Sequence, residues 1–161
     1  MIRAPTGWLI HGSFLLGLLF AILPLPMVLQ PLRPWLLAML VAYWAMEAPT
    51  RVGFGTAFLL GVAADLLTAS ILGEQAFRLV VIAWLVLRFR TRLRFFPLWQ
   101  QAAAVGLLMF NDRIITWFIH ALAGTPPVGL AWWLSPLLAM LLWPWLYVLI
   151  DMARLRARER G

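Results

Sequence analysis

The stretch RFRTRLRFFPLWQQ, residues 88–101, places four arginines at alternate positions between two apolar segments. The rest of the chain shares this basic character. Its 161 residues carry 13 arginines, no lysine and six acidic residues, for a formal net charge of +7. Clustered arginines are typical of proteins that bind nucleic acid and of proteins that are oriented in a membrane. The composition of the whole chain distinguishes between these two classes.

The composition indicates an integral membrane protein. Hydrophobic residues make up 64% of the chain and charged residues 12%, against about 45–50% and about 25% in soluble domains. A water-exposed surface could not be covered with so few polar groups, and no soluble module is left to bind nucleic acid. The chain has no cysteine, which excludes disulfides, thiolate nucleophiles and thiolate metal sites.

Polar breaks divide the chain into six apolar segments. A bilayer core of about 30 Å needs about 20 helical residues, and four of the segments reach that length. We therefore predict an all-α fold, a polytopic membrane helix bundle forming a single integral membrane domain over residues 1–161. The predicted spans are 8–29, 35–48, 52–72, 76–87, 98–121 and 130–150. The second and fourth are short, which suggests tilted, extended or re-entrant helices.

The arginines predict the orientation of this bundle. Short loops rich in arginine stay in the cytoplasm, and an N-in, C-in arrangement puts most of the arginines on that side, whereas Arg33 alone lies in an outer loop. Residues 88–101 are then predicted to form a cytoplasmic loop, and the C-terminus a basic tail, both in contact with anionic lipids. The cytoplasmic set is Arg3, Arg51, Arg88, Arg90, Arg92, Arg94, Arg154, Arg156, Arg158 and Arg160.

Charged residues within the predicted spans are costly and usually face protein or water. Two acids and two arginines lie there: Asp65, Arg78, Asp112 and Arg113. We expect an ion-pair network that determines which helices pack together, with Asp65 and Arg78 forming one pair. Asp112 and Arg113 diverge by about 100° around a helix, so each needs a partner on a neighbouring helix. A proton or substrate pathway is the alternative interpretation.

Small residues recur along the third segment at intervals of four: Gly53, Ala57 and Gly61, followed by Asp65. Such a face lets another helix approach closely. The neighbour is either a helix of the same chain or the transmembrane helix of a partner protein.

Little in the sequence indicates catalysis. His11 and His120 are predicted at opposite membrane faces, so they cannot share a metal or a catalytic triad. Phosphate-binding loops of the G-x-x-x-x-G-K type are missing. We therefore expect no catalytic residue, no metal site and no cofactor.

An ordered set of motifs runs through nearly the whole chain. It comprises YWA at 43–45, PTRVG at 49–53, AF at 57–58, Gly61, Asp65, LG at 72–73, Ala76, FPLWQQ at 96–101 and WPW at 143–145. In content and order this set resembles the rod shape-determining membrane proteins of the MreD family.

The resemblance implies a non-catalytic inner-membrane scaffold of the bacterial peptidoglycan elongation complex, which helps to maintain rod shape. Its expected direct partner is MreC, a single-span protein, received by the small-residue face of the third segment or a surface beside it. RodA, a class B penicillin-binding transpeptidase and MreB are expected as further complex members. The family also resembles the six-helix S-components of vitamin transporters, so the alternative is a small-molecule-binding or transport subunit with a ligand cavity.

Overall fold

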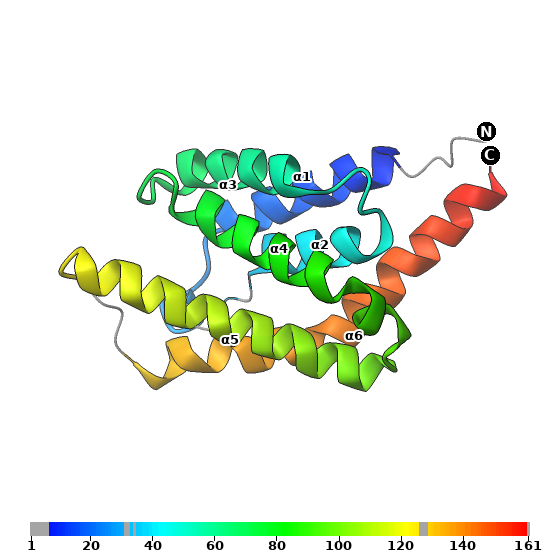
Figure 1. Cartoon of the computed structure of the whole chain (residues 1–161). Coiled ribbons are helices and arrows are strands. Elements are labelled where there is room, and N and C mark those ends of the chain that lie inside the picture. Colours follow the sequence, from blue (N-terminus) through cyan, green and yellow to red (C-terminus); the bar gives the residue numbers. More distant parts are fainter. Residues whose placement is uncertain (1–6, 31–32, 34, 126–128, 161) are drawn as a thin grey trace.

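The computed structural model describes residues 7–30, 33, 35–125 and 129–160. These residues form six helices and no strand, which confirms the all-α prediction (Figure 1). The helices are α1 (Gly7–Ile22), α2 (Leu36–Glu47), α3 (Phe54–Thr68), α4 (Glu74–Phe95), α5 (Leu98–Leu122) and α6 (Leu130–Glu159).

The helices are arranged in three layers. α1 and α3 form one outer layer, α5 and α6 form the other, and α2 and α4 lie between them (Figure 1). Successive helices run in opposite directions along the bundle, so α1 begins and α6 ends toward the same end. We call this end, which also holds the C-terminal ends of α2 and α4, the basic end, because Arg51, Arg90, Arg94 and Arg154 lie there.

The central helix α2 is buried along its length, from Leu37 to Met46. A helix that is apolar on all sides has to be enclosed by protein or lipid, and here α1, α4 and α6 enclose it. Trp44 donates its indole N–H to Ser13 Oγ at 2.8 Å, which joins α2 to α1. With 12 residues, α2 is about 18 Å long, which is less than the roughly 30 Å of a bilayer core and close to the short second segment predicted at 35–48.

Two helices of the first half end earlier than the predicted spans. The first apolar segment was predicted to continue to residue 29, but α1 ends at Ile22, just before Pro24 and Pro26, which cannot donate helical hydrogen bonds. The third was predicted to continue to residue 72, but α3 ends at Thr68. Ala69 follows with φ of 53°, a left-handed conformation that ends helices.

The prediction that residues 88–101 form a loop is wrong. α4 continues through the four arginines to Phe95, and only Phe96 and Pro97 separate it from α5. Arginine is a good helix former, and Pro97 is the first residue here that interrupts a helix. The side-chain amide of Gln101 donates to the carbonyl of Leu93 at 2.9 Å, which holds this tight turn together.

The predicted basic tail is also helical. α6 continues past residue 150 to Glu159, and contains Pro136 and Pro144 within its length. Each proline removes one backbone hydrogen bond and bends a helix. The last turns of α6 line a pocket together with Trp8 of α1. The start of α1 and the end of α6 lie at the same end of the bundle (Figure 1).

Two helices, α5 and α6, are long and apolar enough to cross a membrane by length and composition. α1, α2 and α3 are shorter apolar helices. The outer faces of α3, α5 and α6 expose large aliphatic side chains, such as Leu59, Leu107 and Leu141. Apolar faces of this kind suit contact with lipid or with another apolar helix.

Candidate functional sites

A buried charged cluster joins α4 and α5 at the end of the bundle opposite the basic end. Arg78 donates from Nε to Asp112 Oδ1 at 2.7 Å and from Nη2 to Asp112 Oδ2 at 2.6 Å. Glu74 lies one turn before Arg78, with its Oε1 atom 3.4 Å from Arg78 Nη1 and 3.0 Å from His120 Nε2. The guanidinium of Arg78 also stacks over the ring of Trp35, 4.0 Å from its centroid. The cluster comprises Glu74, Arg78, Asp112 and His120.

Two members of this cluster were missed in the sequence analysis. Glu74 begins α4, but it lies between the predicted spans 52–72 and 76–87 and was therefore not among the charges expected within a span. His120 was interpreted as an interfacial side chain. The two residues are 46 positions apart, and no local pattern pairs them. A carboxylate in the first turn of a helix, four residues before Arg78, is the signal that could have indicated Glu74.

Asp65 does not pair with Arg78, contrary to the sequence-based expectation. Its carboxylate instead accepts hydrogen bonds from Ser70 Oγ at 2.7 Å, from the backbone N–H of Gly73 at 2.8 Å and from that of Gln75 at 3.0 Å. The charge therefore closes the turn between α3 and α4. The free N–H groups at the start of α4 favour a carboxylate at this position over a more distant arginine.

Arg113 and Arg33 also meet at the end opposite the basic end. Arg113 Nη2 donates to Ser135 Oγ at 2.7 Å, and its guanidinium lies over the Trp132 ring at 4.7 Å. Ser135 Oγ in turn donates to the backbone carbonyl of Arg33 at 3.0 Å. The expectation that Asp112 and Arg113 each find a partner on a neighbouring helix agrees with these contacts, since their partners lie on α4 and α6.

These arginines line a cavity of about 240 Å³ that we call the arginine cavity. Every helix of the bundle contributes to its wall, together with Gln30 and Arg33 of the connection between α1 and α2. Arg33, Arg78 and Arg113 face it, and Trp35 and Trp132 complete the wall beside them. Guanidinium groups are donors that suit anionic oxygens.

The small-residue face of α3 packs against α4. Ala57, Ala64 and Asp65 are buried, and a Cβ atom added to Gly61 would overlap the backbone of Ala76 and lie 2.8 Å from the carbonyl carbon of Gln75. Gly53 lies just before α3, where a Cβ atom would meet no neighbour. The face is therefore occupied within the chain, and a partner helix would have to bind elsewhere.

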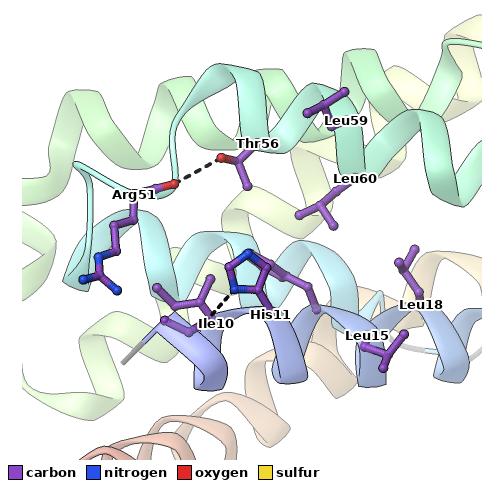
Figure 2. Close-up of a pocket in the computed structure, with 10 residues that line it drawn as sticks. Ile10, His11, Leu15, Leu18, Arg51, Thr56, Leu59 and Leu60 are labelled. Carbon is purple, nitrogen blue, oxygen red and sulfur yellow. Dashed lines mark hydrogen bonds between the residues drawn. The ribbon is translucent and has the colours of Figure 1, made fainter. Parts of the chain in front are cut away.

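A separate groove of about 580 Å³ lies between α1 and α3. Figure 2 shows His11 pointing from α1, and Thr56 and Leu60 pointing from α3, into the space between the two helices. Its walls are largely aliphatic. Arg51 lies at the basic end of the groove, where its backbone carbonyl accepts a hydrogen bond from Thr56 Oγ1 at 3.2 Å. We call this the α1–α3 groove.

At the basic end, arginines hold the C-terminal ends of three helices together. Glu47 of α2 pairs with Arg154 of α6 at 3.0 Å and with Arg94 of α4 at 4.0 Å. Arg90 donates from Nε to the carbonyl of Met46 at 2.7 Å. Cations are favourable at helix C-termini. The remaining arginines of the predicted loop and tail are exposed, namely Arg88, Arg92, Arg156, Arg158 and Arg160.

The described residues contain no group of three or more histidine, cysteine, aspartate or glutamate side chains placed to hold a metal. His11 donates from Nδ1 to the backbone carbonyl of Gly7 at 2.7 Å, near the start of α1, whereas His120 contacts Glu74 at the other end of the bundle. The two histidines are thus far apart, as their positions in the sequence predicted.

Comparison with known proteins identifies the family. The model of the rod shape-determining protein MreD family matches residues 3–153. The rod shape-determining protein MreD of Haemophilus influenzae is 28% identical over 149 residues, which cover 92% of each chain. No solved structure matches the chain. Because the family match covers nearly the whole chain, the protein belongs to the MreD family, whose role is in determining rod shape and is not enzymatic.

Proposed function

We propose that the protein is a multi-pass scaffold of the bacterial inner membrane that binds MreC within the peptidoglycan elongation complex. RodA, a class B penicillin-binding transpeptidase and MreB are the further members of the complex in this proposal. Family membership supports the role in rod shape. The α1–α3 groove is the observation that supports a docking role, since it offers an apolar helix a place between two helices.

The distribution of charge supports an N-in, C-in orientation. Arg90, Arg94 and Arg154 are drawn together by Glu47 and the end of α2, at one end of the bundle. The exposed arginines of α4 and α6 extend from the same end. Arginine-rich ends remain in the cytoplasm, where the exposed side chains would contact anionic lipid headgroups, and MreB is the candidate protein on that side.

We place the transmembrane helix of MreC in the α1–α3 groove. The small-residue face beside it is filled by α4, so the groove is the nearest surface that is open. Leu15 of α1 is 59% exposed and Leu59 of α3 is 70% exposed, and both line the groove. Arg51 at the basic end forms no ion pair with a side-chain carboxylate in the described part of the chain, and would suit an acidic residue flanking the partner's helix.

Site-specific photo-crosslinking in cells that produce MreC tests this placement. A photoreactive residue at Leu59 is expected to form an adduct with MreC. The matched control is Leu141 of α6, which is 64% exposed and belongs to the opposite outer layer of the bundle (Figure 1). Both positions carry an exposed leucine, so the two crosslinking variants differ mainly in which surface of the bundle the photoreactive group occupies.

Each outcome of this experiment is informative. An adduct at Leu59 and none at Leu141 supports the groove. An adduct only at Leu141 would move the docking site to α5 and α6 and contradict the placement. If MreC neither crosslinks nor co-purifies with the full-length protein, direct binding of MreC is itself wrong.

The alternative function, an S-component-like subunit that binds a small molecule, finds less support. It requires a cavity inside the bundle, and the arginine cavity of about 240 Å³ is below the range of about 300–1,000 Å³ for pockets that enclose drug-sized ligands. The larger α1–α3 groove lies between two helices of one outer layer (Figure 2). A groove of this kind suits a helix better than a small polar ligand.

A further inference from the structure

The wall of the arginine cavity is cationic. Arg33, Arg78 and Arg113 come from three different parts of the chain and all line it, together with polar groups of Gln30 and Gln75. None of the six acidic residues of the chain lines it. A group that enters the cavity therefore meets three guanidiniums and no side-chain carboxylate.

Two of these arginines have only neutral hydrogen-bond partners. Arg33 donates to the backbone carbonyls of Ala21 and Leu23, and its buried Nε has no partner in the described part of the chain. Arg113 donates to the hydroxyl of Ser135. Neutral acceptors satisfy hydrogen bonds but leave the positive charge in place, which is unfavourable in a partly desolvated site.

The three acids at this end of the bundle equal the three arginines in number, but in the described part of the chain none of them forms an ion pair with Arg33 or Arg113. Asp112 accepts hydrogen bonds from two nitrogens of Arg78, Nε and Nη2. Glu74 lies between His120 and Arg78. Asp65 accepts three hydrogen bonds from the turn between α3 and α4. The charges of Arg33 and Arg113 are thus left for a ligand to neutralise.

We propose that the arginine cavity binds a phosphate group, carried by a lipid headgroup or present as free phosphate, with Arg33 and Arg113 as its main donors. The planar fork of arginine matches the oxygens of phosphate. Three guanidiniums suit a group with several oxygens better than a single carboxylate. The cavity volume of about 240 Å³ accommodates a group of headgroup size, and Trp35 and Trp132 line it as residues typical of the headgroup level.

This proposal does not depend on the binding of MreC, and it is tested on the purified full-length protein after delipidation in a neutral detergent. The melting temperature is measured with short-chain phosphatidic acid, with diacylglycerol of the same acyl chains, and with inorganic phosphate. We expect phosphatidic acid to raise the melting temperature in a saturable manner and diacylglycerol to leave it unchanged. An equal effect of inorganic phosphate would identify free phosphate as sufficient, and its failure would assign the site to a lipid.

Variants then locate the site. Arg33→Gln and Arg113→Gln are each expected to weaken phosphatidic acid binding by about tenfold. Arg51→Gln is the matched control, because Arg51 is an exposed arginine at the basic end that lies outside α4 and α6, and it should bind phosphatidic acid like the wild type. The proposal is overturned if neither phosphate source stabilises the wild type, or if both cavity variants bind as tightly as the control.

A glutamine variant of a partly buried arginine can fail to fold. In that case Arg113→Lys replaces it, because lysine keeps the charge that the local structure requires but lacks the planar fork. Weaker binding by Arg113→Lys than by the control supports the proposal. Undiminished binding by this variant would overturn the assignment of the cavity.

Discussion

Arg78 on α4 and Asp112 on α5 form a two-pronged ion pair, with N–O distances of 2.7 and 2.6 Å. Their side chains are only 11% and 4% exposed. The pair joins two helices of different layers, and Glu74 and His120 extend it to the ends of α4 and α5. It is therefore a determinant of helix packing at this end of the bundle.

Removing the carboxylate from this pair should be costly. Asp112→Asn is expected to lower the free energy of unfolding by up to about 3–5 kcal/mol, because it removes the carboxylate that makes the two shortest contacts with the buried Arg78 and leaves only Glu74, at 3.4 Å, to pair with that charge. The midpoint of thermal unfolding in detergent measures the effect. Asp151→Asn is the control, since the Asp151 side chain is 45% exposed and 3.7 Å from Arg154, and surface pairs contribute about 0–1 kcal/mol.

A double variant separates packing from chemistry. Arg78→Met with Asp112→Leu removes both charges, and should be more stable than Asp112→Asn alone. If the pair serves only packing, a double variant that is as stable as the wild type should also support rod shape as the wild type does. A stable double variant that loses rod shape would instead favour the proton or substrate pathway considered from the sequence.

Gly61 marks the closest approach of α3 to α4. Gly61→Ala should destabilise the protein by about 1–3 kcal/mol, because the added methyl group overlaps the backbone of Ala76 and can be relieved only by moving a helix. Gly55→Ala on the same helix meets no neighbour within 4 Å and should be stabilising by about 0.5–1 kcal/mol. Thermal unfolding compares the two variants. If Gly61→Ala were as stable as Gly55→Ala, α3 and α4 would have to move apart at little cost.

Asp65 should behave as a residue of the turn. Asp65→Asn replaces one acceptor oxygen by an amide group that faces N–H or O–H donors. We expect it to lower the free energy of unfolding by about 1–3 kcal/mol. Ser70→Ala removes one of its three donors and should cost less. Unfolding midpoints and rod shape are measured together. Unchanged stability with lost rod shape in Asp65→Asn would contradict this role and favour a functional charge.

The orientation of the bundle is tested by cysteine labelling. The native chain has no cysteine, so only the introduced residue can react. Arg51→Cys, Arg92→Cys and Arg156→Cys are expected to react with a membrane-impermeant maleimide only after the inner membrane is opened. Ile71→Cys and Thr125→Cys, in the connections at the other end, should react in intact spheroplasts. Labelling of Arg51→Cys from outside would mean that α2 does not cross and that the six-span topology is wrong.

The candidate sites were predictable only in part. Asp65, Arg78, Asp112 and Arg113 stood out in the sequence because charge is rare in apolar segments, but the expected partner of Arg78 was wrong. The turn after α3 supplies Asp65 with nearer donors, and α5 brings Asp112 to Arg78 across 34 positions. The contribution of Arg33 to a cavity with Arg113 depends on the path of the connection between α1 and α2, which no periodicity indicates.

The sequence by itself determined the membrane class, the six apolar segments and the arginine-rich ends, because hydropathy and charge are properties of each local stretch. It also predicted where α2 and α5 lie to within a residue or two, since prolines and polar breaks bound them. Only the tertiary structure decided that residues 88–95 are helical, that α2 is enclosed, and which charges meet. Those outcomes depend on helices packing across many positions of the chain, where the nearest donor or backbone, and not the nearest residue in sequence, determines the contact.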